Sequence, residues 1–266
     1  MEERVRTEIK GGVADVRMVR TDKMNALDDA MFNALIETGE RLKADPLIHA
    51  VVLSGEGRAF CAGLDTSLFG QMGGGDSSVR RILTPDRTPG GANRGQQAVM
   101  VWREVPAPVI AAIHGVAFGG GLQVALGADL RFVTPDAKLS VMEIKWGLVP
   151  DMAGFPLMRR LLRDDVARDL TYTGRIVTGE EAVAIGLATR VCADPRAEAL
   201  AYAEELAHRS PSALRAAKRL FNAAFDSTER DLLLAESEEQ TALIGAPDQR
   251  EAVQAGLEGR APNFVR

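Results

Sequence analysis

Residues 109–123 read VIAAIHGVAFGGGLQ, an apolar run that leads into a cluster of three consecutive glycines. The run has the length and composition of a buried strand, and a short helix is expected after the glycines. A glycine-rich turn from a strand into a helix leaves backbone N–H groups unpaired and lets another group approach closely. The stretch therefore predicts an α/β unit with a loop that can bind an acceptor atom.

A second loop of this kind lies upstream, after a predicted buried strand at residues 50–53. It reads GRAFCAGLD and covers residues 57–65. Two such loops side by side would direct two N–H donors at one oxygen, an oxyanion hole in which each donor contributes on the order of 10²- to 10³-fold in rate. For either loop alone, tight packing of a strand against a helix through glycine is the simpler explanation.

Two acidic residues follow in the segment LSVMEIKWGLVPD, residues 139–151. Glu143 lies among apolar residues, and Asp151 comes eight positions later, after a turn that contains glycine and proline. A carboxylate in an apolar environment has a raised pKa and can exchange protons near neutral pH. The simpler alternatives are a solvated side chain for Glu143 and a helix cap for Asp151, and taken alone Asp151 is better explained as a cap.

Outward from these segments, predicted strands and helices alternate, which indicates an α/β architecture. Residues 5–10 and 13–20 predict a hairpin, and Asp28 is expected to cap the helix that follows. The buried stripe of that helix would consist of Met31, Leu35 and Leu42. Further along, the pattern predicts a helix at 96–104 and strands at 109–114 and 129–133.

Two regions depart from this alternation. Residues 70–95 are rich in glycine and proline, and predict a long irregular segment with a helical turn near 79–83. This segment is either a lid beside a site or an exposed insertion. After residue 195 the chain is rich in alanine and leucine, and a helical tail of this kind must pack on the body or on another subunit. The helices are expected at 197–209, 211–225, 229–244 and 248–257.

Composition excludes several classes of protein. The chain has 266 residues, 46% of them hydrophobic, which is enough for one substantial core, and its net charge of −5 argues against a nucleic-acid partner. Two cysteines and three histidines without ligand spacing predict neither a disulfide framework nor a metal site, and His114 is expected to be structural. A charged N-terminal segment and the absence of a long apolar run predict a cytoplasmic protein with no membrane span.

Taken in order, several segments resemble those of the crotonase (enoyl-CoA hydratase/isomerase) superfamily. The similarity covers essentially the whole chain; each segment alone is weak evidence, whereas the ordered set is specific. The matching segments are RTDKMNAL at 20–27, AFCAGLD at 59–65, VIAAIHGVAFGGG at 109–121, ME at 142–143, GLVPD at 147–151, and YTGR with the following EEA and GLA at 172–188.

The resemblance implies a spiral of ββα units over residues 1–195 and a helical region over 196–266 that assembles homo-trimers, often paired into hexamers. It also implies an acyl-CoA thioester as substrate and no separate cofactor. The thioester oxygen would lie between the N–H groups of Leu64 and Gly120. Glu143 would be the main acid/base, with Asp151 as its partner. The substrate and its CoA moiety would be bound along Lys23, Met24, Ala26, Ala62, Gly63, Asp65, Gly119 and Gln123.

Departures from the family pattern bear on the reaction. Hydratases of the family usually carry glutamates at the positions of both Gln123 and Glu143, and an amide can orient a water but cannot accept its proton. Asp151 resembles the second acid of dienoyl-CoA isomerases, although those enzymes also carry an acid at the position of Gln123. The leading hypothesis is therefore a double-bond isomerase of enoyl- or dienoyl-CoA. The alternatives are a 2-enoyl-CoA hydratase of fatty-acid β-oxidation that uses Glu143 alone, and a non-catalytic acyl-CoA-binding protein.

Overall fold

A six-stranded sheet forms the centre of the computed structural model, which describes residues 3–71, 83 and 86–264. The strand pair β1–β2 is antiparallel, and the pairs from β2 to β9 are parallel. The two strands β3 and β4 are buried along their whole length, as expected for central strands covered on both faces. In spatial order the strands are β1 (Val5–Lys10), β2 (Val13–Met18), β3 (Ala50–Gly55), β4 (Val109–Ile113), β6 (Leu130–Val133) and β9 (Arg190–Val191).

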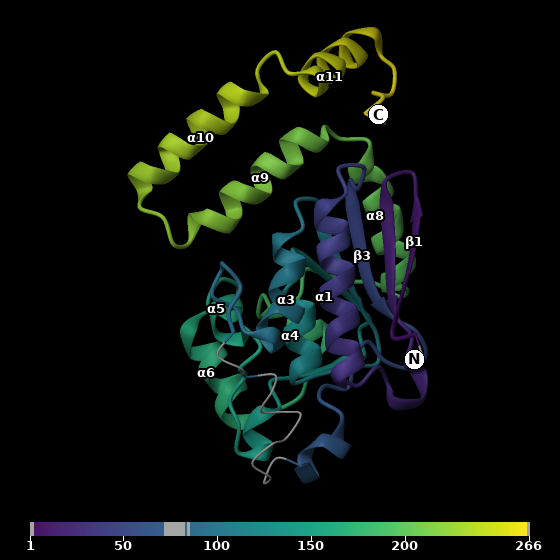
Figure 1. Cartoon of the computed structure of the whole chain (residues 1–266), viewed down its shortest axis with the longest axis vertical. Coiled ribbons are helices and arrows are strands. Elements are labelled where there is room, and N and C mark those ends of the chain that lie inside the picture. Colours follow the sequence, from purple (N-terminus) through teal and green to yellow (C-terminus); the bar gives the residue numbers. More distant parts are fainter. Residues whose placement is uncertain (1–2, 72–82, 84–85, 265–266) are drawn as a thin grey trace.

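The side chains of β3 divide the core into two layers, because successive residues of a strand point to opposite faces of the sheet. Val51 and Leu53 join the larger cluster, which includes the buried faces of α1 (Asp29–Ala44) and α3 (Arg94–Glu104). Ala50 and Val52 join the smaller cluster beneath α8 (Pro195–Ala207), on the other face. Figure 1 shows α1 and α3 in front of the sheet and α8 behind it.

A second, smaller sheet leads the chain away from the large one. Its strands are β5 (Val116–Phe118), β7 (Lys138–Ser140) and β8 (Val177–Thr178). Because β5 begins only three residues after β4 ends, the chain changes sheets just before the glycine cluster. The helix α4 (Gly120–Leu126) begins directly after this change, and all of its residues are buried. The α/β class predicted from the sequence is therefore confirmed.

Caps explain where the first two long helices begin. Asp28 accepts a hydrogen bond from the backbone N–H of Met31 at 2.8 Å and starts α1 as predicted, with Met31, Leu35 and Leu42 buried. Asn93 and Gln96 form a reciprocal capping box, so α3 begins at Arg94 and not at Gln96. The predicted strand at 13–20 ends earlier, at Met18, because the chain then enters the 3₁₀ turn η1 (Thr21–Lys23).

Several short elements complete the body. These are η2 (Thr66–Gln71), η3 (Glu143–Trp146), α5 (Gly154–Met158), α6 (Asp164–Thr173) and α7 (Gly179–Ala184). The two of them that Figure 1 labels, α5 and α6, lie in the lower part of the body. Most of the irregular segment predicted at 70–95 lies outside the described residues, as does almost all of the helical turn expected near 79–83. Residues 88–92 form a turn in which Thr88 Oγ1 accepts from the N–H of Ala92 at 3.1 Å.

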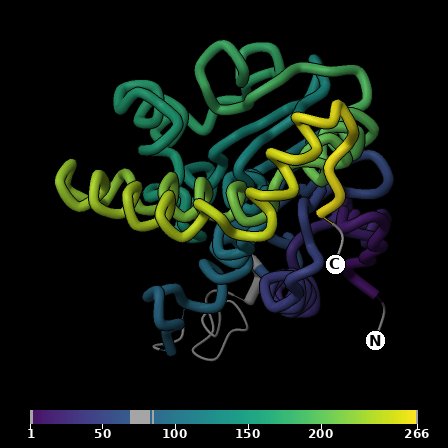
Figure 2. The backbone as a smooth tube through the Cα atoms, turned by 90° about the horizontal axis from the view of Figure 1, so that it is seen from above, coloured from purple at the N-terminus to yellow at the C-terminus, as the bar shows by residue number. Residues whose placement is uncertain are grey.

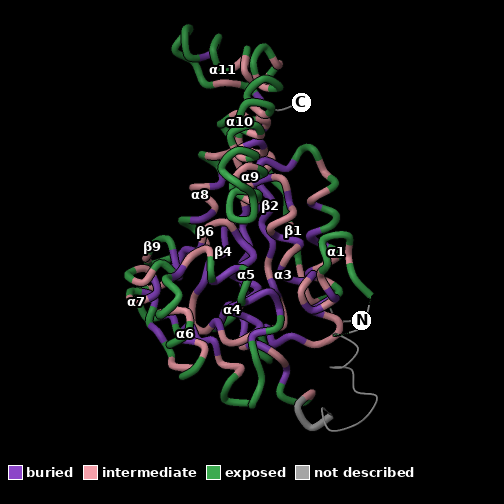
Figure 3. The backbone as a smooth tube through the Cα atoms, turned by 90° about the vertical axis from the view of Figure 1, so that its left-hand side faces the viewer, coloured by how far each residue is buried: buried purple, intermediate pink, exposed green. Residues whose placement is uncertain are grey.

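The three last helices form an arm that projects from the body. They are α9 (Pro211–Ala224), α10 (Glu229–Leu243) and α11 (Pro247–Glu258), and they agree with the predicted helices to within two residues. Figure 2 shows the arm crossing the top of the body, and Figure 3 shows burial concentrated in the body and exposure along α10 and α11. We refer to these three helices as the arm.

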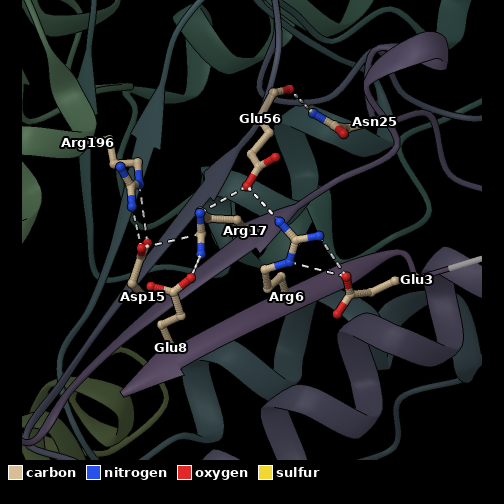
Figure 4. A network of polar contacts seen from close by, with 8 residues as sticks. All are labelled: Glu3, Arg6, Glu8, Asp15, Arg17, Asn25, Glu56 and Arg196. Carbon is tan, nitrogen blue, oxygen red and sulfur yellow. Dashed lines mark hydrogen bonds and ion pairs between the residues drawn. The ribbon is translucent and has the colours of Figure 1, made fainter. Parts of the chain in front are cut away.

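A network of ion pairs connects the N-terminal hairpin with α8 (Figure 4). Arg17 on β2 pairs with Glu8 on β1, with Asp15 and with Glu56 after β3. Arg196 on α8 pairs with Asp15 from the other side. Several partly buried charges that share partners are a better source of stability than isolated surface pairs.

Candidate active site

The two glycine-rich loops predicted from the sequence lie against each other. The N–H of Cys61 donates to the carbonyl of Val116 at 3.0 Å, and the N–H of Phe118 donates to the carbonyl of Cys61 at 3.1 Å. A Cβ atom placed on Gly63 would lie 2.6 Å from the carbonyl oxygen of Phe118, so this close approach requires glycine. The change of sheet after β4 therefore brings β5 to the loop that follows β3.

The N–H of Leu64 in the first loop and the N–H of Gly120 in the second make no hydrogen bond within the described chain. Leu27 bonds to Gly63 and to Asp65, so the N–H of Leu64 between them is directed to the opposite side. Gly120 is the first residue of α4, where no intrahelical acceptor exists for the N–H. The nitrogen of Gly120 lies 3.8 Å from the position of a Cβ on Gly63, so the two free donors belong to touching loops.

Backbone conformation explains why both N–H groups leave the regular pattern. The residue before each donor has a positive φ, 90° at Gly63 and 51° at Gly119. Residues with side chains rarely adopt this conformation, and it turns the next peptide unit away from the direction of the strand. The arrangement fits the predicted pair of donors for one oxygen.

Glu143 lies directly beside this pair of loops. It is the first residue of η3, and its Oε1 would be 3.1 Å from a Cβ placed on Gly119. Its Oε2 is buried and has no hydrogen-bond partner among the described residues. Burial raises the pKa of Glu143 above its ordinary value; the hydrogen bond from Gln123 opposes the rise, and the charge of Asp151 adds to it. The alternative of a solvated glutamate is therefore wrong.

Gln123 contacts Glu143 from α4, one turn after Gly120. It is 3% exposed, and its Nε2 donates to Glu143 Oε1 at 2.6 Å. Its Oε1 accepts from the backbone N–H groups of Met152 at 2.8 Å and Gly154 at 3.0 Å. The amide of Gln123 thus joins the Glu143 carboxylate to the turn before α5.

Asp151 lies in that turn, and its charge acts on Glu143. Desolvation raises the pKa of Asp151 as well, although the residue as a whole is exposed in this single chain. The residue at the N-cap of α5 is Ala153, with φ 66° and no side-chain cap bond. The alternative in which Asp151 caps the following helix is therefore wrong.

Of the predicted substrate- and CoA-binding residues, those at 23–26 lie beside the first loop. The N–H of Ala62 donates to the carbonyl of Met24 at 2.9 Å, which holds residues 23–26 beside the loop. Lys23 is exposed at the end of η1, and Ala26 is buried. Asp65 is buried too, and its carboxylate pairs with Arg20 at 2.7 Å. Burial opposes ionisation of Asp65, but hydrogen bonds from Ser67 and Arg20 hold its pKa below the ordinary value.

Sequence reasoning missed two contributions to this site. Arg20 connects Asp65 to the carbonyl of Ala26, at 3.0 Å; it is the first residue of the segment 20–27 that carries the family resemblance, but it was given no role. The backbone donors of Met152 and Gly154 gave no signal, because they depend on the turn conformation at Ala153. His114, predicted to be structural, places its Nε2 2.9 Å from the carbonyl oxygen of Gly57.

The surroundings of the loops also contain a thiol. Cys61 is buried, its Sγ lies 3.1 Å from the carbonyl oxygen of Asn25, and burial raises the pKa of the Cys61 thiol to about 12. Its backbone carbonyl and Cβ also lie close to Gly121.

A cavity lies elsewhere, between α9 and the body. It has a volume of about 650 Å³, and Leu126, Lys218, Phe221 and Phe225 are among the residues that line it. None of the predicted site residues borders this cavity. The candidate site is defined by the hydrogen bonds and the unpaired groups of the two loops. Across the described ranges, no cluster of His, Cys, Asp and Glu side chains is suited to a metal ion. No helix in those ranges is both long and apolar enough to cross a membrane.

Comparison with known proteins extends over the whole chain. A family model described as enoyl-CoA hydratase/isomerase matches residues 8–266. A relative from Bacillus subtilis (strain 168) that carries the name "Probable enoyl-CoA hydratase" is 32% identical over 254 residues, 94% of each chain. The mitochondrial Delta(3,5)-Delta(2,4)-dienoyl-CoA isomerase of Dictyostelium discoideum is 28% identical over 255 residues, 95% of this chain and 87% of the relative.

Solved structures agree with the sequence comparison. The crystal structure of an enoyl-CoA hydratase from Mycobacterium smegmatis has a TM-score of 0.86 at 28% identity, and the match covers 100% of both chains. The similarity therefore includes the C-terminal helices as well as the α/β body.

Proposed function

Because the chain belongs to the enoyl-CoA hydratase/isomerase (crotonase) family, we propose that it moves a double bond along enoyl- or dienoyl-CoA thioesters. The observation that carries this proposal is the buried, unpaired Oε2 of Glu143 beside the Gly119–Gly120 loop. The neighbour that could have been a second acid is the amide of Gln123, which cannot carry a proton. A single proton carrier suits a reaction that removes a proton and returns it elsewhere.

In the proposed reaction, the thioester oxygen of a 3-enoyl-CoA accepts hydrogen bonds from the N–H groups of Leu64 and Gly120. Glu143 removes a proton from C2, and the electron pair of the C–H bond forms a dienolate whose negative charge the two N–H groups stabilise. The same carboxyl group then returns the proton at C4. The double bond moves from C3–C4 to C2–C3, and no atom is gained or lost. The raised pKa of Glu143 suits both steps near neutral pH.

For a 3,5-dienoyl-CoA, the proton must return at the far end of a longer conjugated system. Asp151 is the second acid available for that transfer, since its charge reaches Glu143 and desolvation raises its own pKa. We propose that Asp151 exchanges protons at this distant carbon.

We propose that the CoA moiety lies along Lys23, Met24, Ala26 and Ala62. The exposed ammonium group of Lys23 suits a phosphate, and the small residues leave room for the pantetheine chain. Asp65 then has a supporting role, because its carboxylate is already bonded to Arg20 and Ser67. The chemistry proposed here requires no separate cofactor.

We further propose that the protein assembles as a homo-trimer or a hexamer through residues 196–266, next to the body formed by residues 1–195. The arm exposes large apolar side chains that a monomer would leave in water. They include Phe221, Leu233, Leu234, Ile244 and Leu257.

The experiment is incubation of 2-enoyl-, 3-enoyl- and 3,5-dienoyl-CoA with the enzyme in D₂O, with the deuterium located by NMR. We expect isomerisation to be faster than hydration, with deuterium at the carbon that receives the returning proton: C4 for a 3-enoyl-CoA and C6 for a 3,5-dienoyl-CoA. Glu143→Gln should lower isomerisation by at least about 10²-fold. Hydration faster than isomerisation, or activity that survives Glu143→Gln, would contradict the proposal. Tight acyl-CoA binding without any exchange would indicate the non-catalytic alternative.

Hydration of 2-enoyl-CoA by Glu143 alone is a second candidate, favoured by the hydratase names of several relatives. In that reaction Glu143 would activate a water for addition at C3. If the missing acid at position 123 is what limits hydration, Gln123→Glu should raise its rate sharply. An unchanged hydration rate in that variant would argue against this candidate.

A further inference from the structure

We propose that Gln123 is a positioning residue that holds Glu143 and the turn carrying Asp151 in a fixed relation, and that it assigns proton transfer to Oε2 of Glu143. This inference rests on the function proposed above and specifies how that site is built. It differs from the role expected for Gln123 in the sequence, which was direct contact with substrate or water.

The bonding pattern determines which way the amide points. One end of the Gln123 side chain lies within hydrogen-bond distance of two backbone N–H groups, those of Met152 and Gly154. An atom that accepts from two donors must be the oxygen, so the NH₂ group faces Glu143. The amide cannot flip without placing its own N–H groups against both backbone donors.

This orientation divides the two oxygens of Glu143 between two tasks. Oε1 accepts from Gln123 Nε2 at 2.6 Å, and a donor of this kind binds an ionised carboxylate more strongly than a neutral one. Oε2 is buried without a partner in the described chain and is the oxygen left to bind a proton. A carboxylate held at one oxygen presents the other in a constant position.

The same amide also fixes the turn that bears Asp151. Ala153 in this turn has φ 66°, a conformation that costs an L-residue roughly 1–2 kcal/mol. The Oε1 of Gln123 bonds to the N–H groups on either side of Ala153 and so stabilises this conformation. Gln123 in turn belongs to α4, three residues after Gly120, and residues at this spacing share one face of a helix. The short helix α4 therefore positions all three groups. Its first residue carries the proposed oxyanion donor, and Gln123 holds both the base and the turn with the second acid.

The titration of Glu143 is coupled to that of a neighbouring acid. Asp151 acts on it directly, whereas α4 and α5 contain no ionisable residue. On η3, Lys145 lies over the ring of Trp146. On and after α6, Arg168 pairs with Asp164, and Arg175 pairs with Asp169 and Glu181.

The first test is Gln123→Met, which keeps the length of the side chain and removes its hydrogen bonds. The hydrogen bond from Gln123 favours the ionised form of Glu143, so its loss should move the acid limb of the kcat profile to higher pH. We expect kcat for isomerisation to fall about 10- to 100-fold, with KM changed less than about threefold. Gln97→Met is the matched control, because Gln97 is also a buried amide that donates to carboxylates, Glu40 and Glu104, but on α3. It should leave the pH profile unchanged.

The second test is Gln123→Glu. Its carboxyl group retains an acceptor for Met152 and Gly154, and while it shares one proton with Glu143 it can still donate to Glu143 Oε1. We expect the isomerase activity of this variant to approach that of the wild type in the pH range where the pair holds one proton, and to fall above it. A merely structural role would give no such pH-dependent rescue.

A readout without turnover separates this inference from the proposed function. The carboxyl stretch of Glu143, followed by infrared difference spectroscopy with Glu143→Gln as reference, should titrate at higher pH in Gln123→Met than in the wild type. Unchanged titration of Glu143 together with an unchanged kcat profile would overturn the inference. If the wild type exchanges no deuterium at all, the proposed function fails, and the infrared titration still decides the role of Gln123.

Discussion

Asp151 raises the pKa of Glu143 through its charge, although the two side chains come from different turns of the chain. The two acids therefore influence each other even for substrates that need only one of them. A substrate with one double bond requires a proton carrier at C2 and C4, within reach of Glu143. A conjugated diene requires a carrier further away, which is the role proposed for Asp151.

We predict that Asp151→Asn separates these two reactions. Isomerisation of 3,5-dienoyl-CoA should fall about 10²-fold, and that of 3-enoyl-CoA should remain within about threefold. Loss of the like charge should lower the pKa of Glu143, so the acid limb of the 3-enoyl-CoA profile should move to lower pH. Steady-state kinetics over the pH range will measure both effects, with the exposed Asp136→Asn as control. Equal losses on both substrates would exclude a separate role for Asp151.

For single residues, the sequence predicted those that belong to motifs with a recognisable order and spacing. Glu143, Asp151 and the two donor loops follow from motifs and their spacing, and the structure brings them together. The partners of Gln123 could not be predicted, because two of them are backbone N–H groups exposed by an alanine at positive φ. No local preference of alanine indicates that conformation.

At the level of the elements, the positive φ values at Gly63 and Gly119 turn the next backbone N–H of each loop away from the regular hydrogen-bond pattern. A side chain at Gly119 would strain the backbone and also lie 3.1 Å from Glu143 Oε1. Gly11, in the hairpin turn between β1 and β2, has a similar φ of 57° and open space around a Cβ. Alanine at Gly11 would therefore cause backbone strain alone, whereas alanine at Gly119 would cause strain and also displace the Glu143 carboxylate.

We predict that Gly119→Ala lowers kcat by at least about 10²-fold, because it displaces both the donor at Gly120 and the carboxylate. Alanine at a positive φ costs roughly 1–2 kcal/mol. Gly11→Ala should therefore lower the free energy of unfolding about as much as Gly119→Ala does, but without lowering kcat. Denaturant titration and steady-state kinetics will distinguish these effects. Comparable kcat values in the two variants would show that the loop conformation is not needed for the reaction.

The helix α9 is attached to the body through the buried ammonium group of Lys218. The ammonium group of Lys218 is buried, donates to the carbonyls of Trp102 at 3.2 Å and Ala107 at 2.9 Å, and pairs with Asp129 at 2.7 Å. Desolvation lowers the pKa of Lys218, and the charge of Asp129 opposes this change. Every proton of this ammonium group therefore has an acceptor.

We predict that Lys218→Met costs about 3–5 kcal/mol in the free energy of unfolding, because it leaves a carboxylate and two carbonyls without their donor. Arg219→Met, which removes an exposed pair with Glu239 on α10, should cost less than about 1 kcal/mol. Chemical denaturation of both variants gives the comparison. A cost below 1 kcal/mol for Lys218→Met would mean that water replaces the lost donor at this position.

Caps and prolines predicted some helix starts but not all: α3, after the Asn93 cap, and α8, at Pro195, each begin two residues before their predicted starts. Asp28 and the Ser210–Pro211 pair begin their helices as the sequence predicts. The position of α9 over the body was not predictable, because it depends on Lys218 reaching carbonyl groups more than a hundred residues away in the chain. Such contacts have no local signature.

Across the whole molecule, burial is divided unevenly between the body and the arm (Figure 3). Among the described residues of α10, none is buried, and Leu233 on that helix is 56% exposed. The helical tail itself was predicted from composition and punctuation. The surface that covers it could not be predicted, because apolar periodicity does not say whether the covering surface belongs to the same chain.

We predict that Leu233→Glu weakens the proposed trimer, because it places a charge in a contact between subunits. Sedimentation velocity should show a shift toward monomer at micromolar concentration, with at least about a tenfold rise in the dissociation constant. Ile9→Glu on β1 is the matched control, since Ile9 is similarly exposed, at 53%, but lies on the hairpin. A monomeric wild type would exclude the proposed assembly.

Burial of the Cys61 thiol affects whether an unsaturated thioester can alkylate the enzyme. An α,β-unsaturated thioester is a soft electrophile, and a thiolate adds readily to its β carbon. Burial raises the pKa of the Cys61 thiol to about 12, so we expect it to stay protonated at physiological pH and to resist alkylation by such a compound. Mass spectrometry after prolonged incubation with crotonyl-CoA should therefore find this cysteine unmodified, whereas the less buried Cys192 provides the internal comparison.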